Sequence, residues 1–141
     1  MTNKLPTVSD FMSEEVPTVF PWDTIKKTYD MLMDHKLRAL PVINGEKKLV
    51  GIISERDIVR YRTLNILPKH AEFYINVSDV MTREVNVFAP ETTLRAACQR
   101  FVETNNNQFP VVEEDRVLGM VRQRDLLGFF VESWDELLKK D

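Results

Sequence analysis

Apolar residues along this chain recur in one order, and that order occurs twice. Each half opens with a short apolar run that ends close to a proline, at 16–20 and again at 85–88, which is typical of a brief strand. Helical spacing follows, because the apolar residues of 25–33 and of 94–102 return four, seven and eight positions apart. Two strands and a second helix complete each half. The strands are predicted at 39–43 with 49–53 and at 109–112 with 117–121, and the last helices near Asp57 and near Asp125.

The sequence itself repeats along with this pattern. Val-Ser-Asp-Phe-Met at 8–12 returns as Val-Ser-Asp-Val-Met at 77–81, and Leu-Pro-Val-Ile at 40–43 returns as Phe-Pro-Val-Val at 109–112. The segment 51–57 then matches 119–125, with one residue missing from the second copy in a charged turn, where a surface hairpin tolerates a change of length. Each copy is therefore predicted to be a β-α-β-β-α unit.

One such unit exposes a helix face and a sheet face that it cannot cover alone. Two units packed together bury both, so the fold class is predicted to be α+β (α/β by some schemes), with the motifs packed as a pseudo-two-fold pair. Residues 1–141 then form a single module with four parts. These are motif 1 at 8–61, a connector at 62–76 apolar enough to pack, motif 2 at 77–131, and a helical extension at 132–141.

Composition narrows the classes of function. The net charge of -3 argues against a nucleic-acid-binding surface. No apolar run approaches the roughly 20 residues of a membrane span, and no signal peptide opens the chain. A single cysteine, Cys98, excludes an internal disulfide and fits a reducing compartment. We therefore expect a cytoplasmic protein that binds neither nucleic acid nor membrane.

The repeated residues resemble a known family. The Val-Ser-Asp-Phe-Met opening, the Leu-Pro-Val-Ile strand and the Gly-Ile-Ile-Ser-Glu-Arg-Asp-Ile ending look like a CBS motif, and two in tandem look like a CBS pair, or Bateman module. The resemblance covers 8–131, and it implies a regulatory or sensor module. Such a module takes AMP, ADP, ATP or S-adenosylmethionine in clefts between the motifs, forms a homodimer and acts on an effector protein that the sequence does not identify. The chain leaves no room for an attached catalytic domain, so a stand-alone regulator is expected.

The resemblance also implies which residues meet the ligand. The family signature is Gly, Ser or Thr, and Asp, where the Asp accepts the ribose hydroxyls; copy one has Ser54 and Asp57, whereas copy two has Arg122 and Asp125. Ser54 and Asp57 are expected to face strand residues of the other copy, and Arg122 and Asp125 likewise. The predicted adenine pocket consists of Val85, Asn107, Gln108, Phe109 and Pro110 for the first pair and of Val16, Ala39, Leu40 and Pro41 for the second, and the candidate phosphate-neutralising residues are Arg38, Arg56 and Arg124.

Simpler interpretations stand beside these. Ser54-x-x-Asp57 is also a helix capping box, and Leu40 and Phe109 are also expected to pack as strand residues. Arg122 places a cation where copy one has a hydroxyl, which predicts that the second site prefers di- or triphosphates over adenosine. His35 and His70 lack partners at metal-ligand spacing, so no metal is predicted.

No catalytic set appears in the sequence, so an enzyme is not expected. The leading hypothesis is a non-catalytic module that binds an adenosine-containing ligand, and the alternative is a ligand-free module for dimerisation or protein interaction.

Overall fold

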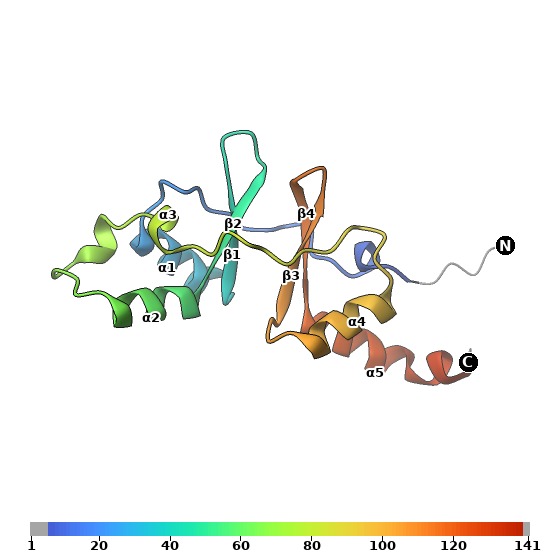
Figure 1. Ribbon diagram of the computed structural model, residues 1–141. Coiled ribbons are helices and arrows are strands. Elements are labelled where there is room, and N and C mark those ends of the chain that lie inside the picture. Colours follow the sequence, from blue (N-terminus) through green and yellow to red (C-terminus); the bar gives the residue numbers. More distant parts are fainter. Residues whose placement is uncertain (1–5, 140–141) are drawn as a thin grey trace. The chain divides into compact units, whose positions relative to one another are not determined.

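The computed structural model describes residues 6–139, with side chains to residue 132. The chain divides into two compact units (Figure 1). The first unit is Val16–Val85; the second unit combines the described residues up to Glu15 with those from Asn86 onward. Both contain helices and strands, as the predicted α+β class requires.

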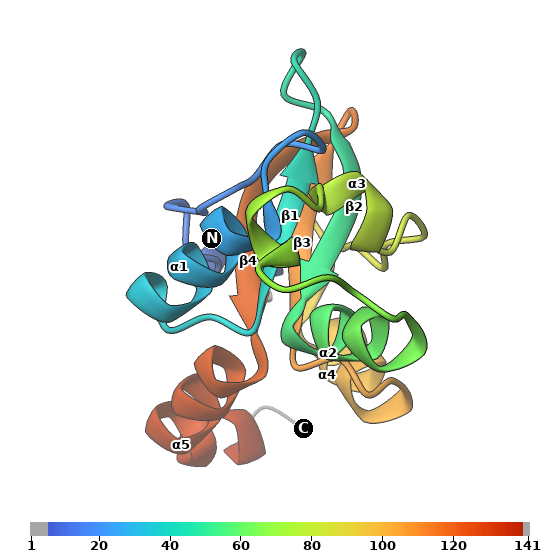
Figure 2. The same ribbon diagram turned by 90° about the vertical axis from the view of Figure 1, so that its left-hand side faces the viewer.

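The first unit is a hairpin of two strands with helices packed on it. Its main elements are α1 (Ile25–His35), β1 (Ala39–Ile43), β2 (Leu49–Ser54), α2 (Glu55–Leu64) and α3 (Val77–Val80). Figure 2 shows β1 and β2 side by side, with their turn at one end and α2 leaving the other. Val19, Leu32, Leu40, Val42, Ile53 and Val77 are buried together at the centre of this unit.

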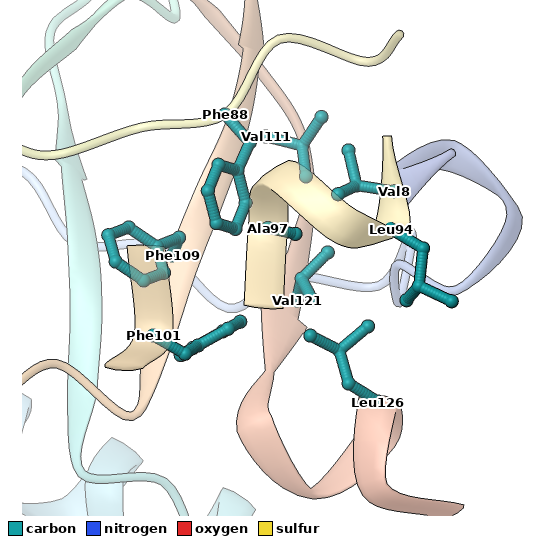
Figure 3. Packing of buried hydrophobic residues seen from close by; sticks show 9 residues of the cluster. All are labelled: Val8, Phe88, Leu94, Ala97, Phe101, Phe109, Val111, Val121 and Leu126. Atoms are coloured by element: carbon teal, nitrogen blue, oxygen red, sulfur yellow. The ribbon is translucent and has the colours of Figure 1, made fainter. Parts of the chain in front are cut away.

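The second unit repeats the arrangement with α4 (Leu94–Glu103), β3 (Gln108–Glu113), β4 (Arg116–Arg122) and α5 (Gln123–Lys139). Its core is more aromatic than that of the first unit. Figure 3 shows Phe88, Phe101 and Phe109 gathered beside α4, and their ring centroids lie 4.4–5.8 Å apart. Tilted and edge-on aromatic pairs of this kind add stability beyond the area that they bury.

The predicted first strand of each copy is reduced to a single parallel bridge. Val19 bridges Val42 in the first unit, and Phe88 bridges Val111 in the second. Each makes two main-chain hydrogen bonds of 2.8–3.1 Å. Prolines at 17, 21 and 90 flank these residues and lack the N–H that a longer ladder requires, which explains the short pairing.

The two openings of the repeat are exchanged between the units. Val8 belongs to the core of the second unit, although its sequence begins motif 1, and Val77 belongs to the core of the first unit. The residues after each opening pair with the sheet: Ser13 bridges Met120, and Thr82 bridges Ile52. Each compact unit thus contains the opening segment of the other sequence motif in place of its own.

Two glycines make this approach of the openings feasible. A Cβ on Gly51 would lie 2.8 Å from Met81 Sδ and 2.9 Å from the carbonyl oxygen of Thr82. A Cβ on Gly119 would lie 2.6 Å from Met12 Sδ and 2.8 Å from the carbonyl oxygen of Ser13. Both signature glycines therefore serve the packing of main chain on main chain.

The connector packs in part. Ala71, in a 3-10 turn at Ala71–Phe73, is buried, and Ile75 packs against the core of the first unit. Leu67 is half-buried. Four other apolar residues are exposed, which the prediction of a packed connector does not account for: Leu64, Ile66, Phe73 and Tyr74.

Candidate functional site

Ser54 and Asp57 form a reciprocal capping box at the start of α2. The Asp57 N–H donates to Ser54 Oγ at 3.0 Å, and the Ser54 N–H donates to Asp57 Oδ2 at 2.9 Å. Ser54 is extended and ends β2, so its side chain reaches the first turn of the helix that follows. The capping role that the sequence left open is present in the structure.

A third residue completes this group. The hydroxyl of Thr82 donates to Asp57 Oδ1 at 3.0 Å, although the two residues lie 25 positions apart. An ionised carboxylate offers about four lone-pair directions. With one acceptor direction used on each oxygen of the half-buried Asp57, both oxygens keep room for a further donor. Capping and ligand binding by Asp57 are therefore compatible.

The second copy builds the same position with a different partner. Asp125 Oδ2 accepts the main-chain N–H of Arg122 at 3.2 Å, which is half of a capping box. The guanidinium of Arg122 supplies the rest, with Nε 3.2 Å from Oδ2 and Nη2 3.1 Å from Oδ1. Both Asp125 oxygens thus face a cation in place of a hydroxyl, so a ribose would compete with the guanidinium for this carboxylate.

The main chain before each β-hairpin meets the start of the following helix. The Glu55 N–H donates to the Arg38 carbonyl at 2.9 Å, and the Gln123 N–H donates to the Asn107 carbonyl at 2.8 Å. In α2 the N–H of Glu55 is thus bonded to the Arg38 carbonyl, and the N–H of Asp57 is bonded to Ser54 Oγ. Two main-chain donors at the start of α2 are therefore not free to bind a phosphate.

The residues predicted to hold adenine are mostly buried in their own units. The side chains of Leu40 and Phe109 have no exposed area and belong to the two cores, which supports the packing role. Ala39, Pro41, Gln108 and Pro110 are buried as well, Val16 and Val85 are half-buried, and Asn107 is exposed. The adenine site that we predicted from residues of both units stays a prediction.

The candidate phosphate-neutralising residues Arg38, Arg56 and Arg124 are exposed. No ion pair is recorded for them among the residues that the structure describes. This position suits a contact with an anion, and it also suits an ordinary solvated surface charge.

Sequence reasoning missed Thr82 as a member of the group. A signal was present, because both openings are followed by a hydroxyl residue, Ser13 in one copy and Thr82 in the other. The two differ in the structure: Ser13 Oγ lies 3.4 Å from the Glu15 carbonyl, whereas Thr82 reaches the carboxylate of Asp57.

Other chemistry is sparse. Within residues 6–132 no group of three or more His, Cys, Asp or Glu side chains is placed to hold a metal. Cys98 packs beside the aromatic core, and burial raises the pKa of its thiol. None of the helices described is long and apolar enough to cross a bilayer.

Comparison with known proteins places both copies in one family. The family model described as CBS domain matches residues 8–63 and 77–132. A CBS domain-containing protein of Bacillus subtilis, YhcV, is 28% identical over 86% of this chain and 84% of its own length. The protein MJ1225 of Methanocaldococcus jannaschii is 27% identical over 90% of this chain, and an inosine-5'-monophosphate dehydrogenase of Korarchaeum cryptofilum is 29% identical over 94%. This chain spans only 44% and 26% of those two proteins.

Solved structures share the fold. CBSX2 in complex with AMP has a TM-score of 0.76 at 26% identity and is matched over 89% of this chain and 96% of its own. The CBS domain pair of MJ0100, in complex with 5-methylthioadenosine and S-adenosyl-L-methionine, has a TM-score of 0.76 at 25% identity over 89% and 99%. The CBS-domain containing protein ATU1752 of Agrobacterium tumefaciens has a TM-score of 0.76 at 24% identity over 91% and 96%, which shows the fold alone.

Proposed function

The chain belongs to the CBS domain family, and from that premise we propose that it is a non-catalytic regulatory module that binds an adenosine-containing ligand. The ligand class is AMP, ADP, ATP or S-adenosylmethionine, as in the complexes of CBSX2 and MJ0100. Ser54 and Asp57 are the residues of the first site, and Arg122 and Asp125 are those of the second. The proposed partners are a second copy of the chain and an effector protein.

One observation carries the proposal: Asp57 already accepts a hydroxyl. The bond from Thr82 Oγ1 to Asp57 Oδ1 has the chemistry of a bond from a sugar hydroxyl to a carboxylate. The carboxylate is oriented by the Ser54 N–H, so it pays little further entropy when it binds. A ribose cis-diol is thus the kind of group that this oriented carboxylate is suited to accept.

The mechanism we propose is a shift between conformations. A ligand that binds one arrangement of the chain more tightly than another favours that arrangement, and an effector protein recognises it. The size of the shift is limited by the difference in affinity between the two arrangements.

A thermal-shift panel tests the proposal. AMP, ADP, ATP, S-adenosylmethionine and NAD are compared on wild type and on Asp57→Ala. A ligand at about 100 times its Kd adds roughly 2.7 kcal/mol, which is a shift of several degrees for a domain of this size. We expect a shift with at least one adenine ligand that is smaller in Asp57→Ala, because only the second site then remains. If none of the five ligands shifts the wild-type melting temperature, the proposal is wrong.

Arg122 sets the expected phosphate preference of the second site. Its guanidinium can leave Asp125 for a di- or triphosphate, which adenosine lacks. In an Asp57→Ala background, Arg122→Ala should therefore weaken ATP and ADP more than adenosine, as measured by calorimetric titration. Equal losses for adenosine and ATP would remove this role from Arg122.

A ligand-free interaction module is the second candidate. It is favoured by the capping bonds between Ser54 and Asp57 and by the burial of Leu40 and Phe109. Val59 and Leu127, at 65% and 61% exposure, offer apolar surface for a second copy. Sedimentation of the chain with and without the adenine ligands separates the candidates. The ligand-free module predicts a dimer whose sedimentation none of these ligands changes.

A further inference from the structure

We infer a second small-molecule site in the first unit, separate from Ser54 and Asp57: a cavity under the connector that fits a small amphipathic anion. Its volume is about 360 Å³, within the range of small-molecule sites. It lies where the chain leaves α2, turns back and returns to α3 (Figure 1). The inference does not depend on the proposed nucleotide function.

The floor of this cavity is apolar and consists of residues that pack against the core of the unit. Ile25 is buried, and Ile58, Ile75 and Val80 are partly buried and pack against the core. Ala71, which is buried, anchors the connector over them. The apolar part of a ligand would gain from contact with these side chains by leaving water.

The rim of the cavity is cationic. Arg62, at the end of α2, and Lys69 and His70, in the connector, line it together with one acid, Glu72. His70 Nδ1 lies 3.9 Å from Glu72 Oε1, so that acid faces the histidine. Among the residues described, neither Arg62 nor Lys69 has an ion-pair or hydrogen-bond partner for its side chain. Two unpaired cations above an apolar floor suit a single carboxylate on an apolar body.

The chain takes a different path at the corresponding place in the second copy. The residues that correspond to the start of the connector continue as α5, which runs to Lys139. The connector that lines this cavity is therefore not part of the repeat, and the lining does not include Ser54 or Asp57.

The test uses octanoate as the probe and the whole chain as the protein. Amide chemical shifts are followed during titration with octanoate, octan-1-ol and octylammonium. Octanoate should shift amides of 58–80 and bind at least tenfold more tightly than octan-1-ol or octylammonium. The affinity for octanoate should fall as salt increases.

Variants in α2 and in the connector locate the charge. Arg62→Gln and Lys69→Gln should each weaken octanoate about two- to fivefold, as expected for one exposed charge–charge contact, and leave octan-1-ol unchanged. Arg60→Gln removes the same charge from an exposed position of α2 outside the cavity and should leave octanoate binding unchanged. Thermal melting confirms that the variants are folded. Equal binding of octanoate and octylammonium, equal losses in Arg60→Gln and Arg62→Gln, or shifts outside 58–80 would overturn the inference.

Discussion

The two copies of the repeat place a carboxylate at the same point of the fold and satisfy it differently. Asp57 is held by the main chain of Ser54 and a distant hydroxyl, Thr82. Asp125 is held by both the main chain and the guanidinium of Arg122. The change from Ser54 in one copy to Arg122 in the other thus replaces a neutral capping hydroxyl with a guanidinium that forms an internal ion pair. The two copies thus keep the position of the carboxylate and differ in the groups that bind it.

The largest expected effect is a loss of stability when the glycine that both copies share is replaced. Gly51→Ala and Gly119→Ala each place a Cβ under 3.0 Å from a main-chain carbonyl oxygen, so each should lower the free energy of unfolding by about 1–3 kcal/mol. Gly119→Ala should cost more, because its contacts are shorter. Urea denaturation measures both.

The matched control is Gly45→Ala, since nothing lies within 4 Å of a Cβ at that position. It should change stability by less than about 0.5 kcal/mol. A Gly51→Ala variant as stable as Gly45→Ala would show that the opening segment does not pack as described.

The next effect is a difference in stability between equivalent substitutions in the two copies. Ser54→Ala removes a capping hydroxyl and should cost about 1 kcal/mol. Arg122→Ala removes a partly exposed ion pair, with side chains 39% and 24% exposed, and should cost only a few tenths of a kcal/mol. Urea denaturation in low and high salt tests the difference: only the Arg122→Ala effect should shrink as salt rises.

A smaller effect tests the long-range hydroxyl. Thr82→Val keeps the shape of the side chain and removes its bond to Asp57, which should cost about 0.5 kcal/mol at this exposed position. Ser13→Ala, the matching change in the other copy, should cost less, because Ser13 Oγ makes only a 3.4 Å contact. Thermal melting of the two variants compares them, and an equal loss would contradict the assignment of Thr82.

Local signals predicted much of this fold. The four main helices and both hairpins were predicted from local sequence patterns, and the capping box follows from Ser54-x-x-Asp57, because each depends on residues close in sequence. The short helix α3 was not predicted. The exchange of the openings and the bond from Thr82 to Asp57 were not predicted, since both join residues far apart in the chain. The exposure of Ile66 was not predicted either, because the sequence of a connector does not show which of its apolar residues face the protein.

Recognition of the ribose diol by Asp57 is the central claim, and one titration series tests it most directly. AMP and 2'-deoxy-AMP are titrated into wild type, Asp57→Asn and, as the control, Asp79→Asn, which changes the acid of another capping box in the same unit. The account predicts that wild type and Asp79→Asn prefer AMP by about tenfold or more, the value of roughly one charged hydrogen bond, and that Asp57→Asn loses the preference. If Asp57→Asn keeps the preference for AMP, or if wild type binds both nucleotides equally, Asp57 is a helix cap and not the ribose acceptor.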